Sequence, residues 1–508
     1  MIHSYAQREI FKPGSPVSDW CKKPETLKSF WPFPGNTAGI EAAIGARGPV
    51  DLQRRKQVAN AIRRQYAAVG INPPRSLNEF EKGFEVISVG HQLQAGGGPA
   101  FFHYKILSAL RWAAQLRASG TPAIAVYWMA SEDHDFAEIS TTYAPGGVTF
   151  EWTPEYLEQS PVGRITWDAR AERDWKRWCS AVLRRNSDFQ AQSMPLAHRV
   201  RHWIEEWFGH NQLVVVDGDD PDLKSLATSV LTPEWSGNGI STALSMSAAD
   251  YADKWISVPL QVQDNNLFVL EESGLRMRAD RWLDEYGEDK VEGLRPNQLS
   301  PNAALRPLYQ EFLLQSAAFV GGPSEVGYWL MLGRAFQHHR VAQPALLVRD
   351  GAFVHQESTK WAAAACDWTP KLPALTGDMA VAAWADKQLM GNGELDRAFE
   401  EWSKALIAHA KGVPGDAVPT TRAALTKMEK EMVMVRKKWR KILRHQCAKE
   451  VQIIREAFDG WICPDGKMQE RRLSALPLME AEGGGVAFAQ KWFETVNGAD
   501  EPQFLVFC

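Results

Sequence analysis

One run of eight residues limits the folds open to this chain more than any other feature. Residues 123–130 read Ala-Ile-Ala-Val-Tyr-Trp-Met-Ala and are apolar at every position. A strand that is apolar on both sides has to be covered on both sides, as the central strands of a parallel sheet are. Shorter apolar runs at 86–89 and 213–216 alternate with helical patterns. The sequence therefore predicts an α/β fold built on an open parallel sheet.

Helices are expected to connect and cover this sheet. Apolar periodicity, with Gly or Pro at the ends, predicts them at 51–69, 99–118, 306–318 and 325–338. Two stretches interrupt the alternation, and we interpret both as insertions into a core that spans 1–377. One is polar and Trp-rich, near 149–193, and the other lies near 256–300 and begins as a β-hairpin would.

The C-terminal third has a different pattern. Residues that could form the contact seam of a coiled coil recur there in steps of three and four, and charged residues surround them. The seam residues are Leu425, Met428, Met432, Val435, Trp439, Ile442, Gln446, Lys449 and Ile453. Such a heptad predicts a coiled coil. With a shorter seam at 395–409 and a turn at 412–421, it predicts an antiparallel α-helical coiled-coil hairpin at 378–458, and 459–508 then returns to the core. The seam favours a homodimer; the alternative is a surface hairpin packed on its own domain.

Charge and cysteine usage count against several classes of protein. Lys and Arg number 57 against 61 Asp and Glu, a formal charge of -4, so neither nucleic acid nor a membrane is an expected partner. The first twenty residues hold no apolar leader, and no apolar run is long enough to span a bilayer. The six cysteines are dispersed, which disfavours a disulfide framework or a structural zinc site. We therefore expect a cytoplasmic protein with reduced thiols.

The strongest candidate for chemistry follows the apolar run directly. Ser131, Glu132, Asp133, His134 and Asp135 crowd ionisable groups at the carboxyl end of a predicted strand, where open α/β sheets bind ligands. Such crowding perturbs pKa values. His134, oriented by Asp133 or Asp135, could act as general base toward an amine or a thiol, and the cluster could also hold Mg²⁺ through Asp133 or Asp135. The alternative is an ordinary polar loop or helix cap.

A glycine-rich turn after the strand at 86–89 is the second candidate. It contains Gly90, His91, Gln92, Gly96, Gly97 and Gly98. A helix is predicted to start at Pro99, and bare backbone N–H groups at a helix start favour a phosphate or a carboxylate. Lys105, two turns further on, could reach the same anion. The spacing matches neither the dinucleotide fingerprint nor the P-loop, so a flexible loop is the alternative.

Two more predicted helices contribute a third group of polar residues. They are Asn302, Arg306, Gln310, Gly322, Glu325 and Tyr328. Arg306 and Gln310 share a helix face, and Arg306 could clamp a carboxylate with two N–H groups. Gly322 precedes a second Gly-Pro helix start and is another candidate anion site. The alternative is an exposed arginine paired with a glutamate.

Taken together, these motifs resemble the bacillithiol biosynthesis cysteine-adding enzymes. The segment Tyr127–Phe136, with Glu138-Ile139 after it, closely resembles the acid–histidine hallmark of that family. Three further blocks are similar in the same order: Gly90, Gln92, Gly98, Pro99 and Lys105; then Arg306-Pro307, Tyr309-Gln310-Glu311, Gly321-Gly322-Pro323, Glu325 and Tyr328-Trp329; then Pro464, Gly466, Gln469, Glu470 and Arg471. His91 and Gln94 depart from the family pattern, which usually has Gln and Gly there.

The resemblance implies a Rossmann-like core with connecting insertions and a coiled coil that mediates dimerisation. It also implies a ligase that joins cysteine to the amine of glucosaminyl-malate in the last step of bacillithiol synthesis. The carboxyl must be activated, usually by a nucleotide such as ATP, but the sequence identifies neither the cofactor nor a metal. The rival interpretations are a nucleotidyltransferase-like or other nucleotide-dependent enzyme on the same fold, and a dimeric coiled-coil scaffold without catalysis.

Overall fold

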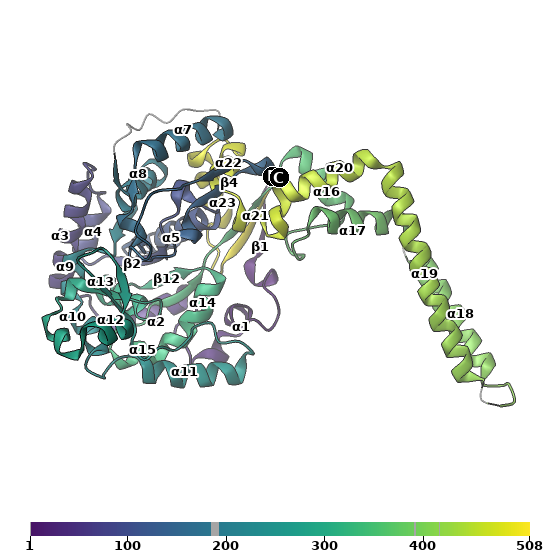
Figure 1. Cartoon of the computed structure of the whole chain (residues 1–508), viewed down its shortest axis with the longest axis horizontal. Coiled ribbons are helices and arrows are strands. Elements are labelled where there is room, and N and C mark those ends of the chain that lie inside the picture. The colour runs from purple at the N-terminus through teal and green to yellow at the C-terminus, as the bar shows by residue number, and fades with distance from the viewer. Residues whose placement is uncertain (1, 184–192, 391–392, 416) are drawn as a thin grey trace. The chain divides into compact units, whose positions relative to one another are not determined.

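The computed structural model describes residues 2–183, 193–390, 393–415 and 417–508 (Figure 1). The chain forms two compact units: unit 1 comprises Met1–Val354 and Leu473–Cys508, and unit 2 comprises His355–Arg472. Unit 2 begins and ends outside the helical range 378–458 expected from the sequence. Residues 184–192, part of the insertion expected near 149–193, lie outside the described residues.

A five-stranded parallel sheet forms the centre of unit 1. Its strands, in spatial order, are β13 (Ala345–Val348), β12 (Ala318–Gly321), β2 (Glu85–His91), β3 (Ala123–Met129) and β8 (Val214–Asp217). All neighbouring pairs are parallel, and Trp128 of β3 lies opposite both Gly90 and Val216. Every residue of β3 is buried, as the apolar run predicts. The expected α/β class is confirmed.

The order of the strands places a topological switch in the middle of the sheet. From β2 the chain moves outward through β3 to β8, then returns to β12 on the other side of β2 and continues to β13. Open α/β sheets bind ligands in the crevice at such a point, beyond the carboxyl ends of the strands. The ends of β2 and β12 carry two of the predicted motifs, the glycine turn and Gly322.

Sequence periodicity did not predict β12. It predicts helix as far as residue 318, but α13 (Arg306–Leu314) ends at Gln315, which adopts a left-handed conformation with a φ of 45°. The four residues of β12 follow and are buried throughout. An apolar run this short fits a helix or a buried strand, and here pairing with two neighbouring strands decides. Beyond it, α14 (Pro323–Trp329) and α15 (Gly333–His338) replace the single helix expected at 325–338.

The remaining helices of unit 1 surround the sheet. They are α1 (Pro16–Lys22), α2 (Thr37–Arg47), α3 (Leu52–Ala68), α4 (Ser76–Glu81), α5 (Phe101–Ala118), α6 (Phe136–Ile139), α7 (Ala169–Leu183), α8 (Leu196–Phe208), α9 (Pro221–Leu226), α10 (Thr228–Leu231), α11 (Ser241–Lys254), α12 (Ala279–Tyr286), α22 (Ala475–Ala481) and α23 (Gly485–Val496). Helices α3 and α5 confirm the expectations at 51–69 and 99–118. Asp51 caps α3 by accepting the backbone N–H of Arg54. Helix α5 packs along β2 and β3, and Ser88 of β2 donates to Glu311 of α13 (3.0 Å).

The described residues of unit 1 also form four small sheets. In one, β9 (Leu267–Leu270) lies between β10 (Arg276–Arg278) and β11 (Leu299–Pro301), which confirms the expected hairpin. In another, β15 (Gln503–Phe507) lies between β1 (Ile2–Ala6) and β14 (Gly351–Val354), so the two ends of the chain pair directly. The last two are the pairs β4 (Thr141–Tyr143) with β5 (Thr149–Glu151), and β6 (Thr166–Trp167) with β7 (Met194–Pro195).

A layer of tryptophans covers the glycine turn. The ring of Trp203 lies 5.0 Å from that of Trp167 and 5.4 Å from that of Trp175, centroid to centroid. A Cβ atom on Gly96 would come within 2.3 Å of the Trp175 ring, and one on Gly97 within 2.6 Å of the Trp207 ring. Both glycines also have positive φ. Glycine is required at these two positions because indole rings occupy the space of a side chain and the backbone is left-handed.

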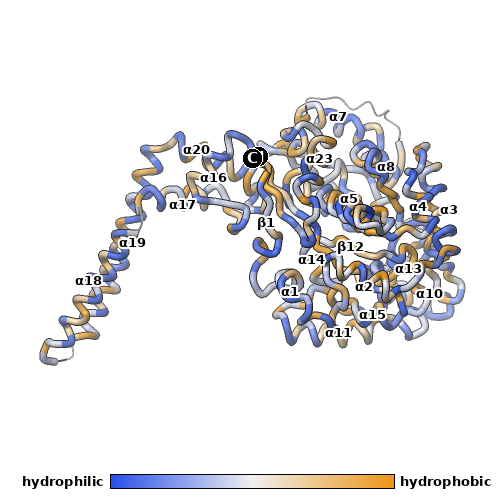
Figure 2. Tube along the Cα trace, turned by 180° about the vertical axis from the view of Figure 1, so that it is seen from behind, coloured by the Kyte–Doolittle hydropathy of each residue, from blue (hydrophilic) through white to orange (hydrophobic). Residues whose placement is uncertain are grey.

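Unit 2 is helical. Its helices are α16 (Glu357–Ala365), α17 (Gly377–Met390), α18 (Glu394–Ala410), α19 (Val418–Gln446), α20 (Ala448–Ala457) and α21 (Gln469–Arg472). Helices α18 and α19 lie side by side, with Arg436 paired to Asp396 at 2.5 Å. Hydrophobic and hydrophilic stretches alternate along both (Figure 2). The seam expected over 425–453 is not one helix, because the backbone breaks at Cys447 (φ -109°, ψ 47°) and α20 packs against α17.

None of the described helices combines the length and apolarity that crossing a bilayer requires.

Candidate functional site

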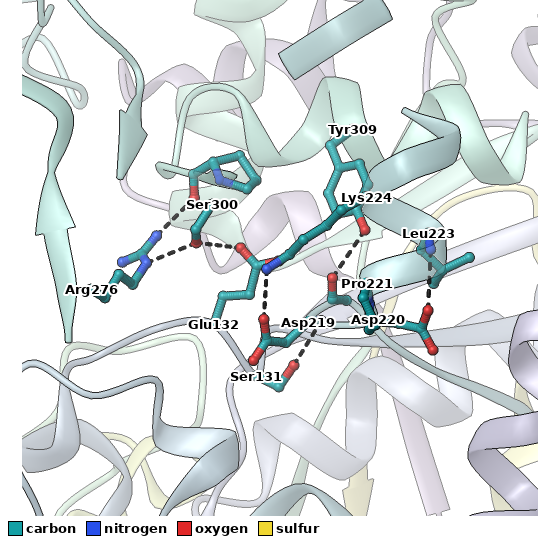
Figure 3. Close-up of polar contacts among 12 residues, drawn as sticks. Ser131, Glu132, Asp219, Asp220, Pro221, Leu223, Lys224, Arg276, Ser300 and Tyr309 are labelled. Carbon is teal, nitrogen blue, oxygen red and sulfur yellow. Dashed lines mark hydrogen bonds and ion pairs between the residues drawn. The ribbon is translucent and has the colours of Figure 1, made fainter. Parts of the chain in front are cut away.

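The acid–histidine turn, residues 131–135, follows the end of β3. Figure 3 shows Ser131 and Glu132 of this turn beside Asp219, which follows the end of β8. Ser131 donates a hydrogen bond to Asp217 and accepts one from the backbone N–H of Asp219 at 3.2 Å. From the opposite side, the hydroxyl of Tyr309 donates to the carbonyl oxygen of Gly218 at 3.0 Å. Burial raises the pKa of Asp217. The turns after two neighbouring strands are thus joined to each other and to α13.

Glu132 lies within a buried network of charges. It accepts a hydrogen bond from Ser300 and lies 3.2 Å from the ammonium of Lys224, which is fully buried and also contacts Asp219 at 2.6 Å. Arg164 holds the other side of Asp219 with two N–H groups, at 2.6 and 3.0 Å. Burial raises the pKa of Glu132 against the opposing effect of Lys224. Burial alone would raise the pKa of Asp219, but Lys224 and Arg164 bring it below its usual value.

Arg276, on β10, connects this network to the imidazole. Its Nε donates to Ser300 at 2.9 Å, one Nη donates to the carbonyl oxygen of Pro301 at 2.8 Å, and the other Nη lies 2.9 Å from Nδ1 of His134. The guanidinium also stacks 3.8 Å from the ring centre of Phe268. Every nitrogen of Arg276 therefore has a partner, and the side chain is almost completely buried.

His134 is partly exposed at the edge of this cluster, whereas Glu132, Lys224 and Arg276 are buried. One third of its side chain is exposed. Burial lowers the pKa of His134, and the Arg276 guanidinium lowers it further against the opposing effects of Asp133 and Asp135. The imidazole is therefore neutral at neutral pH.

The two aspartates that flank His134 are occupied by hydrogen bonds within the turn. One oxygen of Asp133 accepts the backbone N–H groups of His134 and Asp135, at 2.7 and 3.3 Å, and the other accepts the amide of Gln92 at 2.5 Å. Burial alone would raise the pKa of Asp133, but these donors and Arg276 lower it. Asp135 caps α6. In the described part of the chain no three His, Cys, Asp or Glu side chains gather around one point.

Arg306 lies at the topological switch, where β2 and β12 end. It donates to Gln310 at 3.1 Å and to the hydroxyl of Tyr328 at 3.0 Å. A Cβ atom on Gly90 would come 3.1 Å from one of its Nη atoms, so glycine lets the guanidinium lie against the strand. Both acceptors are neutral, and among the described residues no carboxylate lies within ion-pair distance of Arg306. Its side chain is half-buried, and its positive charge is available to an incoming carboxylate.

Lys105 is the second cation at this switch, and it is already paired. The ammonium is buried, forms an ion pair with Glu325 and donates to the carbonyl oxygen of Gly90 at 3.2 Å. Glu325 in turn accepts the backbone N–H of Gly322 at 2.9 Å, which starts α14. Burial lowers the pKa of Lys105, and Glu325 opposes this effect. We expected Lys105 to bind an external anion, but its ammonium is paired with the carboxylate of Glu325 inside the protein.

The structure separates several predicted residues from these two clusters. Gly96–Gly98 are buried under the tryptophan layer, and the N–H of Gly97 donates to the carbonyl oxygen of Gln94, an arrangement unlike an open anion site. The ring of His91 packs between Phe101 and Phe102. Asn302 accepts backbone N–H groups at the start of α13. Gln92 is the residue of the glycine turn that reaches the acid–histidine turn.

Comparison with known proteins assigns the chain to a family. Residues 9–350 match the family model described as "Bacillithiol biosynthesis BshC, N-terminal Rossmann-like domain". The chain belongs to the BshC family. A relative from Cytophaga hutchinsonii is 27% identical over 498 residues, which cover 91% of each chain. One from Flavobacterium psychrophilum is 31% identical over 333 residues, covering 60% of this chain and 61% of the relative. Both relatives carry the name "Putative cysteine ligase BshC".

Some residues of the site in this BshC-family chain were not predicted from the sequence. Asp217 and Asp219 follow the third apolar run directly, so their position at a strand end was a usable signal. Lys224 and Arg276 carry no such signal, because each lies among other polar residues of a helix or hairpin. Only the packing of α9 and β10 against the sheet ends brings them to Glu132 and His134.

Proposed function

We propose that this chain is a ligase that adds L-cysteine to the amine of glucosaminyl-malate, the last step of bacillithiol synthesis. Membership in the BshC family and the names of its relatives support a cysteine ligase. Both substrates carry carboxylates, and one contributes an amine. A ligase for this pair therefore has to hold an anion close to polar groups that can contact the reacting atoms.

Arg306 is the observation that carries this proposal. It is a half-buried cation at the point of the sheet where α/β folds bind ligands, and its side-chain acceptors among the described residues, Gln310 and Tyr328, are neutral. A guanidinium presents parallel N–H groups that match a carboxylate. We assign Arg306 to a carboxylate of the malate group or of cysteine, and the exposed edge of the acid–histidine turn to the reacting groups.

The proposal can be tested in lysates, which supply whatever activates the carboxyl. A bacillithiol-producing bacterium that lacks its own cysteine-adding gene would carry the gene for this chain. Its lysate, fed with cysteine and glucosaminyl-malate, should form bacillithiol. Arg306→Met should lower the rate about 30-fold or more, because loss of a charge-assisted contact costs about 2–5 kcal/mol. Arg334→Met, which removes a surface ion pair with Asp250, should leave the rate unchanged. The absence of bacillithiol with the unaltered chain, or an active Arg306→Met variant, would contradict the proposal.

We further propose that the chain forms a homodimer through one face of α18 and α19. Seven apolar residues line this hairpin face, with Lys427, Glu431 and Arg436 among them: Leu395, Phe399, Trp402, Met428, Met432, Val435 and Trp439. Between 40% and 48% of Leu395, Trp402, Met428, Val435 and Trp439 is exposed. Apolar side chains gathered in this way mark an interaction surface, and a second copy of the same hairpin offers the matching seam.

A further inference from the structure

The Nδ1 atom of His134 has two charged neighbours at different distances. An Nη atom of Arg276 lies 2.9 Å away, whereas the Asp133 carboxylate oxygen lies 3.8 Å away. A guanidinium has only N–H donors and keeps its protons, so Nδ1 has to supply the lone pair in this contact. In a neutral imidazole the single ring proton then resides on Nε2.

Arg276 is held firmly in the orientation that produces this contact. Ser300 and Pro301 accept its other N–H groups, and Ser300 itself donates to Glu132. Phe268 covers the face of the guanidinium and also packs against the imidazole, with ring centres 5.6 Å apart. Turning the guanidinium away from His134 would break several buried hydrogen bonds at once.

We propose that Arg276 is a positioning residue that holds His134 in the Nε2–H tautomer, so that His134 donates a hydrogen bond to an oxygen of the substrates. The identity of those substrates rests on the function proposed above. A proton on Nδ1 would set two donors face to face, and Nε2 already carries its proton. Neither nitrogen can therefore take a proton from the substrate amine while the Arg276 contact persists. This role differs from the general base expected from the sequence.

Nε2 of His134 is suitable for a substrate contact. Among the described residues it has no hydrogen-bond partner, and one third of the side chain is exposed. The charged groups that face the ring are Arg276, Asp133 and Asp135. A fixed N–H of this kind is worth most toward an oxygen on which negative charge develops during reaction.

The tautomer can be measured on the purified full chain without any assay of ligase activity. Histidine labelled with ¹⁵N gives distinct resonances for protonated and unprotonated ring nitrogens, and the signals lost in His134→Gln identify those of His134. Between pH 7 and 8 we expect an unprotonated Nδ1 and a protonated Nε2. Arg276→Met should give a mixture of the two tautomers. A proton on Nδ1 in the unaltered chain would overturn the proposal, whether or not the variant folds.

A pair of substitutions separates a donor from a base. His134→Gln keeps an N–H donor but has no basic nitrogen, whereas His134→Ala has neither. In the lysate assay we expect His134→Ala to lose about 100-fold of the rate and His134→Gln to stay within about 10-fold of the unaltered chain. Equal losses in the two variants, or none in His134→Ala, would overturn the donor role. If the unaltered chain forms no bacillithiol, the proposed function fails while the tautomer measurement still stands.

Discussion

At the scale of single residues, burial decides how the histidines of this protein behave. His103 of α5 is completely buried among aromatic rings, with Trp207 at 4.7 Å and Phe208 at 5.6 Å between ring centres. Neither of its ring nitrogens has a hydrogen-bond partner among the described residues. Burial lowers the pKa of His103 from 6.5 to about 3. His103 packs beside the glycine turn and is a structural residue that folding keeps neutral.

This burial predicts an acid-sensitive contribution to stability. An unfolded chain binds a proton at His103 below pH 6.5, and the folded chain does so only near pH 3. The stabilising contribution is thus complete above pH 6.5 and is lost as the pH falls toward 3. Relative to His103→Leu, the unaltered chain should lose up to about 1.4 kcal/mol of unfolding free energy per pH unit in this window. Urea unfolding at pH 7, 6, 5 and 4 measures the difference; parallel curves for the two proteins would refute it.

At the scale of elements, the close approach of α13 to β2 determines the switch-point site. The absence of a side chain at Gly90 leaves room for Arg306 and Gln310, whose polar atoms lie 3.1 and 3.3 Å from the place of a Cβ atom. These contacts are tighter than most carbon contacts, so even a methyl group has to displace the guanidinium.

Gly90→Ala should therefore lower ligase activity with little loss of stability. A displacement of a fraction of an ångström at a substrate-binding arginine is expected to cost about 10-fold in rate in the lysate assay. Gly45→Ala is the matched control, because a Cβ atom at Gly45 meets nothing within 4 Å and alanine suits the interior of α2. A Gly90→Ala variant as active as the control would show that the position of Arg306 is not critical.

At the scale of the whole molecule, association of two chains would use the hairpin face of unit 2. Val435 lies on that face and is 41% exposed, while Val433, two residues earlier on α19, lies off it and is 58% exposed. The same substitution can thus be placed on and off the proposed interface.

Val435→Glu should weaken the dimer, and Val433→Glu should leave it intact. A carboxylate at the centre of the apolar seam would lose its hydration on association, and the carboxylates of the two copies would repel each other. Sedimentation at graded protein concentrations measures the shift from dimer to monomer. A monomer at every concentration of the unaltered chain would refute the dimer, and equal effects of the two substitutions would place the interface elsewhere.

Local patterns in the sequence were sufficient to predict the strands β2, β3 and β8, the helices α3 and α5, and the position of the acid–histidine turn. Apolar runs and periodicity show which side chains of a segment face the core, and this can be read from the segment alone. The same evidence failed at β12, where four apolar residues continue a helical pattern and only pairing with β2 and β13 makes them a strand. It also missed the break at Cys447, because heptad steps continue across it.

The sequence by itself determined that a buried parallel strand ends in a cluster of acids and one histidine. Only the tertiary structure decided the neighbours of that cluster. Arg276 lies 142 residues from His134 along the chain, and the packing of α13 brings Arg306 beside Gly90 at the switch point. The physical reason is that hydrogen bonds and ion pairs depend on positions in space, whereas the sequence reveals periodicity only along the chain.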